Sequence, residues 1–356
     1  MFGAKTVNFT RAQRCNRENH VVDANSKSDS PDLLATQKRP SENQDRLSPS
    51  VPRMRHYFGR RANAFMQAVA IGCLPLAYFI AWFVTWGFWA FARSARASSY
   101  DYLRRIDPDI SSLALRWRSH RHFYEYAMSL IDSSIVLTGH GERFSLTCPD
   151  KDALYRAAES PGGLLIITAH VGTIEVVAPR LSQLLHNRKA YFVMYQDMSD
   201  ATEQFRSENW QGLQPFGIIN SMDPISAGIQ IAKALMAGDV VGMRADRKVS
   251  GKSIGADVLG QPAQLPHGPF MAAVATGATV VFAFAFRTGH CAYELHVSEP
   301  RSYGCQDIDD KPAMIEKAAR EFAAALSAAA RSYPNQWFNF YPFWLSASDP
   351  EKSKIN

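Results

Sequence analysis

One short segment constrains the fold of this chain more than any other. Residues 163–169 read Gly-Leu-Leu-Ile-Ile-Thr-Ala, an apolar run of strand length that ends at a single histidine, His170. A helical pattern begins at Glu175, five residues further on. A buried strand that leads directly into a helix is typical of an α/β domain, and open α/β sheets carry their chemistry at the carboxyl ends of the strands. The segment therefore makes His170 a candidate catalytic base.

The rest of the chain repeats this alternation. Upstream, the spacing of apolar residues predicts two amphipathic helices over 97–132, broken near Asp107-Pro108, and a strand, turn and helix over 144–158. Downstream, apolar runs predict further strands at residues 190–195, 240–245, 280–287 and 293–297, and helical patterns cover residues 201–209, 225–237, 269–276 and 311–330. We expect an α/β fold with a mostly parallel central sheet covered by helices on both faces.

The N-terminal 60 residues have the composition of a disordered basic tail. Residues 1–65 hold twelve Lys and Arg against six Asp and Glu, and this surplus of six equals the net charge of the whole chain. The basic character therefore belongs to the tail, and the remainder is balanced. A basic tail beside an apolar segment suits anionic lipid headgroups better than nucleic acid, so no nucleic-acid partner is expected.

Residues 61–96 are expected to form a hydrophobic membrane anchor. The stretch 65–92 has no charged residue, and at about 1.5 Å per residue it is long enough to cross a hydrocarbon core of ~30 Å. Pro75 is expected to kink this helix or split it in two. The anchor either spans the membrane or lies in its interface, and the alternative is a buried core helix. Arginines flank both sides, so its orientation stays open.

The cysteines give no indication of a metal site or a disulfide framework. There are five, none is in CxxC spacing, and they are scattered along the chain. The composition favours reduced thiols in a domain on the cytoplasmic side of the membrane.

The spacing of His170 and Glu175 restricts where the histidine lies. On one regular helix, side chains five residues apart point about 140° away from each other. The two can therefore meet only if His170 lies in the turn between strand and helix, where Gly172 permits an unusual backbone. The alternative is a structural histidine at a strand end.

Further candidate residues follow the later strands. Asp246 and Arg247 come directly after the strand at 240–245, where the arginine could bind a phosphate or carboxylate or form a structural ion pair. Pro266, His267 and Gly268 precede a helix whose first N–H groups could bind an oxyanion. The aromatic block 335–344 indicates core packing or a membrane-facing edge.

Residues 251–255 match the G-x-S-x-G pattern of serine hydrolases, with Ser253 as the nucleophile. That motif requires a strand before it and a helix after it, which the flanking sequence does not provide. We therefore predict a solvated loop here and keep a Ser253 hydrolase as an alternative function.

Taken in order, these blocks resemble the lysophospholipid acyltransferase superfamily, and within it the branch of bacterial lipid A late acyltransferases. The resemblance covers residues 60 to 344. It rests on His170-x4-Glu175, on Val-Gly-Met-Arg-Ala-Asp246-Arg247, on 257–260 and 265–269, and on the closing block 336–344. It implies an acyltransferase domain at 97–345 that resembles the glycerol-phosphate acyltransferases in fold, followed by a polar tail at 346–356.

The resemblance also implies a mechanism and a location. His170, oriented by Glu175, would act as general base while a hydroxyl or amine of a lipid or glycolipid attacks an acyl thioester of acyl carrier protein or coenzyme A. No metal, cofactor or covalent intermediate would be needed. Substrates would be bound by Gly172, Gln196, Asp246, Arg247, Pro266, His267 and Gly268. Because the thioesters are cytosolic, the domain would lie at the cytoplasmic side of the bacterial inner membrane, with membrane lipids as partners.

One departure from the branch concerns the acceptor. Late lipid A acyltransferases often carry Arg-Pro after the second strand, where this chain has Tyr195-Gln196-Asp197. The resemblance therefore does not imply a lipid A precursor as acceptor. A non-catalytic membrane-associated assembly protein is the remaining alternative, and the sequence leaves acyl length, donor carrier and oligomeric state open.

Overall fold

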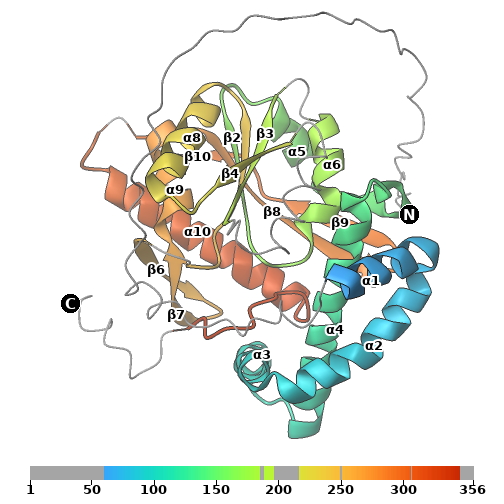
Figure 1. The fold of residues 1–356 in the computed structure, drawn as a ribbon. Helices are drawn as coiled ribbons and strands as arrows, with labels where there is room; N and C mark the ends of the chain where they lie inside the picture. The colour runs from blue at the N-terminus through green and yellow to red at the C-terminus, as the bar shows by residue number, and fades with distance from the viewer. Residues whose placement is uncertain (1–59, 185–187, 196–215, 249–250, 306, 345–356) are drawn as a thin grey trace, which may run out of the picture. The chain divides into compact units, whose positions relative to one another are not determined.

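A computed structural model describes residues 60–184, 188–195, 216–248, 251–305 and 307–344. Its centre is an eight-stranded sheet in the order β1-β9-β8-β2-β5-β3-β4, with β10 paired to β8 (Figure 1). The strands are β1 (Ser145–Thr147), β2 (Leu164–Thr168), β3 (Ala190–Met194), β4 (Phe216–Asn220), β5 (Val240–Arg244), β8 (Thr279–Gly289), β9 (Ala292–Val297) and β10 (Arg301–Ser302). A separate hairpin joins β6 (Ser253–Val258) to β7 (Gln261–Pro266).

The sheet is mostly parallel, which confirms the predicted fold class. β2 pairs in parallel with β5 and β8, and β3 with β4 and β5. Only the β8–β9 and β8–β10 pairings of this sheet are antiparallel among the described strands. The short β1 pairs in parallel with β9.

Helices cover both faces of the sheet. Residues of β8 alternate between the two faces: Phe282 and Phe284 contact Phe322 of α10, whereas Val281 and Ala283 belong to the buried cluster of the opposite face, which includes residues of α4 and α6. The helices of the described residues are α1 (Arg60–Gly72), α2 (Leu74–Phe91), α3 (Arg93–Ile106), α4 (Ser112–Leu137), α5 (Lys151–Ala158), α6 (Ile174–Leu184), α8 (Pro224–Met236), α9 (His267–Thr276) and α10 (Lys311–Ser332), and a 3₁₀ turn covers Gly141–Arg143.

The apolar N-terminal segment forms two helices, as the proline predicted. α1 ends at Gly72, and Pro75 occupies the first turn of α2, where its missing N–H costs nothing. By length and composition α2 could cross a membrane, which is weak evidence for an anchor. The described helices belong to one compact unit that also contains the sheet. α2 packs against α4 (Figure 1).

The β6–β7 hairpin and β4 differ from the predicted elements. The predicted solvated loop around Ser253 is wrong, because Ser253 is the first residue of β6 in the antiparallel hairpin. Strand β4 was not predicted either, because its five residues lack a long β-branched run. The helix expected at 201–209 and the tails at 1–59 and 346–356 lie outside the described residues.

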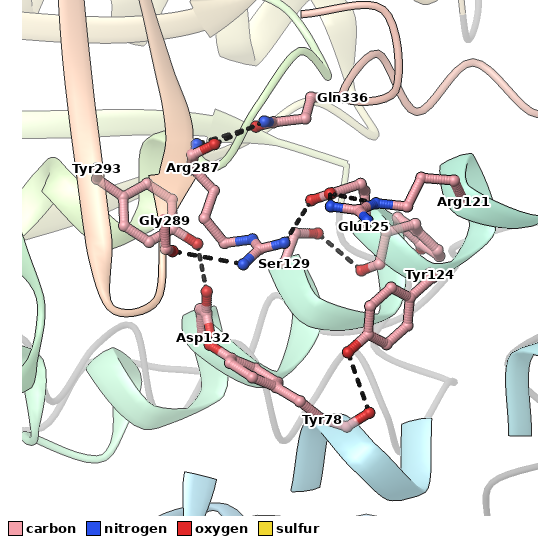
Figure 2. Close-up of polar contacts among 11 residues, drawn as sticks. Tyr78, Arg121, Tyr124, Glu125, Ser129, Asp132, Arg287, Gly289, Tyr293 and Gln336 are labelled. Carbon is pink, nitrogen blue, oxygen red and sulfur yellow. Dashed lines mark hydrogen bonds and ion pairs between the residues drawn. The ribbon is translucent and has the colours of Figure 1, made fainter. Parts of the chain in front are cut away.

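A buried polar cluster joins α2 and α4 to the sheet (Figure 2). The Asp132 carboxylate on α4 accepts hydrogen bonds from the phenols of Tyr78 on α2 and Tyr293 on β9. Asp132 and Tyr293 are almost fully buried. Burial raises the pKa of Asp132 to about 6 even though both phenols favour its ionised form.

A second carboxylate of α4 holds the carboxyl-terminal part of β8 in place. Glu125 accepts from Arg287 at 2.8 Å and from Arg121 at 2.9 Å. The Gln336 side chain accepts from the Arg287 backbone N–H at 2.9 Å and donates to the Arg287 carbonyl at 2.8 Å (Figure 2). Helix α4, strand β8 and the segment that follows α10 are thus tied together by charged and amide groups.

We predict that Asp132→Ala destabilises the protein by about 2–4 kcal/mol, because two buried phenols lose their acceptor. The matched control is Asp101→Ala, since the Asp101 side chain is 50% exposed and pairs along its own helix with Arg105. That change should cost no more than ~0.5 kcal/mol. Thermal unfolding followed by circular dichroism measures both, and equal effects would contradict a structural role for the cluster.

Candidate active site

The register of the parallel sheet places a carboxylate beside His170. In the β2–β5 pair, Thr168 lies opposite Arg244, and the Ala245 N–H donates to the Thr168 carbonyl at 2.9 Å. His170 and Asp246 each follow that register pair by two residues. They therefore leave the sheet side by side at its carboxyl edge, where open α/β sheets bind their substrates.

Asp246 holds His170 by two hydrogen bonds. Its Oδ1 lies 2.8 Å from His170 Nδ1, and its Oδ2 accepts the His170 backbone N–H at 3.0 Å. The indole N–H of Trp337 donates to the same Oδ2 at 3.0 Å. Asp246 and Trp337 are fully buried, while the His170 side chain remains 27% exposed.

These contacts fix the protonation of the pair. Burial by itself raises the pKa of Asp246, but the charge and hydrogen bond of His170, together with Arg247 and the Trp337 N–H, hold it well below its usual range. An ionised carboxylate only accepts, so His170 Nδ1 must carry a proton. Burial lowers the pKa of His170 to about 4, against the opposing charge of Asp246. The ring is then neutral, and its Nε2 can take up a proton.

The turn that carries His170 is held by the segment after α10. The Phe338 N–H donates to the His170 carbonyl at 2.8 Å, and the Gly172 N–H donates to the Gln336 carbonyl at 2.7 Å. Gly172 has a positive φ of 65°. The turn lies between β2 and α6, as the spacing from His170 to Glu175 required. The aromatic block therefore packs in the core and clamps the turn.

Glu175 lies in the first turn of α6 and forms an ion pair with Arg244 at the end of β5. The carboxylate that binds His170 Nδ1 is Asp246, which the sequence had placed among substrate-binding residues. Glu175 and Arg244 line a small cleft of about 20 Å³ whose other walls include Phe192 and Met194.

Arg247 lies close enough to the pair for its charge to lower the pKa of His170. Its guanidinium stacks on the Tyr341 ring at 4.8 Å, and its buried Nε has no hydrogen-bond partner in the described part of the chain. The Tyr341 hydroxyl donates to the Asp246 carbonyl at 2.7 Å. Arg247 therefore places a positive charge beside the His170–Asp246 pair.

No hydrogen bond or ion pair within the described ranges joins Pro266, His267, Gly268 or Ser253 to this pair. Pro266 ends β7, and His267 begins α9 with its N–H bonded to the Lys252 carbonyl at 3.1 Å. A side chain at Gly268 would meet open space. Ser253 lacks the strand-to-helix turn of a nucleophile elbow. Gln196 lies outside the described residues.

No group of three His, Cys, Asp or Glu side chains that could hold a metal occurs in the ranges listed above for the structure. The expectation that the reaction needs no metal or cofactor stays a prediction. The geometry of the site rests on a histidine, two carboxylates and two arginines.

Three residues of the site were missed by sequence reasoning. Arg244 pairs with Glu175, Trp337 donates to Asp246, and Gln336 anchors the His170 turn. Gln336 and Trp337 belong to the block that the sequence analysis assigned to core packing or a membrane-facing edge. The adjacency of β2 and β5 is the signal that would have found the His170–Asp246 pair. Equal offsets from Thr168 and Arg244 then bring the two side chains together.

The fold and site define an α/β enzyme domain with a histidine–carboxylate pair at the carboxyl edge of a parallel sheet. The family model described as "Bacterial lipid A biosynthesis acyltransferase" matches residues 142–346, more than half of the chain. The chain belongs to this family and is an acyltransferase, which confirms the resemblance seen in the sequence. A search of curated proteins found no match.

We predict that Gly172→Ala destabilises the protein by about 2–4 kcal/mol and disturbs the site, since it combines an unfavourable φ with a clash. A Cβ at this position would overlap the Ala285 carbonyl oxygen. Gly228→Ala is the control, because Gly228 lies within α8 with open space around it and should gain up to ~1 kcal/mol. Denaturant unfolding measures both changes. A neutral Gly172→Ala would show that the turn is less constrained than described.

Proposed function

We propose that the protein transfers a fatty acyl group from an acyl thioester, carried by acyl carrier protein or coenzyme A, to a hydroxyl or amine of a lipid or glycolipid. The observation that supports this most is the neutral, partly exposed His170 held by a buried, ionised Asp246. Such a pair is suited to general-base catalysis. Membership of the acyltransferase family supplies the reaction class.

In the proposed mechanism His170 Nε2 takes the proton from the acceptor O–H or N–H. The acceptor atom then bonds to the thioester carbonyl carbon, and negative charge develops on the carbonyl oxygen. Collapse of this intermediate breaks the C–S bond. The imidazolium of His170 returns its proton to the leaving thiolate, so the products are an acyl ester or amide and a free thiol. Asp246 stabilises the imidazolium between these steps.

The proposal gives the two carboxylates different tasks. Asp246 orients His170, because it contacts Nδ1 directly. Glu175 forms an ion pair with Arg244, and both residues line the cleft. Arg247 supplies positive charge toward the phosphates of a substrate or the developing oxyanion.

The same proposal places the enzyme on the cytoplasmic side of a bacterial inner membrane. Support comes from α2, which buries Ala77, Ala81 and Thr85 but leaves a stripe of large apolar side chains exposed on its other side. An exposed apolar stripe on one side of a helix favours contact with lipid. The stripe consists of Leu76, Phe79 and Phe83.

We predict that His170→Ala abolishes acyl transfer and that Asp246→Asn lowers it by roughly a thousandfold or more, since an amide at this position allows the wrong tautomer of His170. Glu175→Gln should lose much less. Lipid extracts from cells lacking the protein, complemented with each variant, can be compared by mass spectrometry. The mass added by the wild type also identifies the acyl chain and the acceptor.

Thermal unfolding of each purified variant separates loss of function from loss of fold. Transfer that persists in a folded His170→Ala variant would rule out the proposal. A loss in Glu175→Gln as large as that in Asp246→Asn would instead return the orienting role to Glu175. Labelling with a fluorophosphonate probe, compared between wild type and Ser253→Ala, tests the hydrolase alternative.

A further inference from the structure

A continuous chain of hydrogen bonds, buried except at its partly exposed first member, leads from helix α2 to the candidate active site. The Trp89 indole on α2 donates to Ser119 on α4 at 3.1 Å, and Ser119 lies 3.0 Å from the Ser99 hydroxyl on α3. Ser99 lies 3.1 Å from His122 Nδ1, and His122 Nε2 lies 2.7 Å from the Trp337 carbonyl. We call these four side chains the His122 relay.

All hydrogen bonds in this relay run in the same direction from donor to acceptor. A carbonyl oxygen only accepts, so the His122 Nε2 must carry a hydrogen. Burial lowers the pKa of His122 to about 4, which leaves the ring neutral and Nδ1 without a proton. Ser99 must then donate to Nδ1, Ser119 must donate to Ser99, and Trp89 donates to Ser119. Each donor in the relay is satisfied by the next acceptor.

The relay ends on the residue that supports Asp246. The backbone of Trp337 receives the His122 hydrogen bond, and its indole donates to Asp246 at 3.0 Å. The next residue, Phe338, donates its N–H to the His170 carbonyl. The position of Trp337 thus affects both members of the catalytic pair. The Trp337 carbonyl also accepts the N–H of the neighbouring Asn339 at 2.8 Å. Of these two donors, His122 is the one that ties Trp337 to another element, helix α4.

We propose that His122 is a positioning residue for catalysis: its Nε2–H fixes Trp337, and through Trp337 it holds Asp246 against His170. This inference rests on the proposed function and extends the site to α2, α3 and α4. Through these hydrogen bonds, helices α2 and α3 are connected to the His170–Asp246 pair.

A second buried histidine on the same helix provides a comparison. His120 is as buried as His122, but it contacts Thr85 and stacks on Trp86, both of which belong to α2. It has no contact with residues 336–344 among those that the structure describes. Replacement of His120 changes packing between α2 and α4 without touching Trp337. The His120 variant therefore measures how much stability is lost when a buried histidine is removed from the α2–α4 interface.

The test replaces His122 by each of two amides. His122→Gln can place an amide N–H near the former Nε2 and keep the donor to Trp337. His122→Asn reaches only as far as Nδ1, so it keeps a partner for Ser99 and loses the donor. His120→Gln is the packing control, and Asp246→Asn defines the result when His170 loses its carboxylate. All variants are made in the full chain in detergent.

The readout is the rate at which diethyl pyrocarbonate modifies His170, followed by mass spectrometry of the peptide that contains it. The reagent attacks the neutral imidazole at the nitrogen that acts as base, so no acceptor lipid is needed. We expect His122→Asn to slow the reaction on the order of tenfold, toward the rate of Asp246→Asn. His122→Gln and His120→Gln should react at nearly the wild-type rate, whatever their melting temperatures.

A wild-type rate for His122→Asn, or an equal loss in His122→Gln, would overturn the inference. A rate that follows the melting temperature across all variants, His120→Gln included, would also overturn it by showing a packing effect alone. The outcome is independent of acyl transfer. If His170→Ala leaves lipid acylation unchanged, the proposed function fails while the reactivity of His170 still decides the role of His122.

Discussion

The site depends on the hydrogen-bond donors that surround one buried carboxylate, that of Asp246. Asp246 accepts the His170 ring N–H, the His170 backbone N–H and the Trp337 indole N–H, and Arg247 adds positive charge nearby. A buried carboxylate is costly unless donors of this kind compensate it. Because two of the donors belong to His170, the same bonds that stabilise the charge fix the ring and its tautomer. Nε2 is left as the nitrogen that can accept a proton.

The elements that supply these donors explain why helices far upstream matter to the site. Residues 336–338 hold the His170 turn through backbone pairing, and α4 holds residues 336–337 through Arg287 and His122. α4 in turn is joined to α2 through Asp132 and Tyr78 (Figure 2). A change at the α2–α4 interface can therefore reach the sheet edge through packed and hydrogen-bonded groups.

Much of the fold followed from local sequence signals, and less of the site did. The strand before His170, the break at Pro75 and the helix 311–332 were predictable because each depends on periodicity or on a proline. The His170–Asp246 contact joins positions 76 residues apart and requires β2 beside β5. Strand order is a property of the whole sheet, so sequence spacing pointed first to Glu175, the carboxylate nearer in the chain. The hairpin at Ser253 was missed because glycines and charges obscure its alternation.

The most direct test of this account is the ¹⁵N NMR spectrum of the imidazole of His170, in protein labelled at histidine and assigned by loss of the signal in His170→Ala. We expect a neutral ring at pH 6.5, with a protonated Nδ1 and an unprotonated Nε2, because burial lowers its pKa to about 4. The Asp246→Asn variant should lose this preference. A proton on Nε2, or an imidazolium at that pH, would contradict the claim that Asp246 prepares His170 as a base.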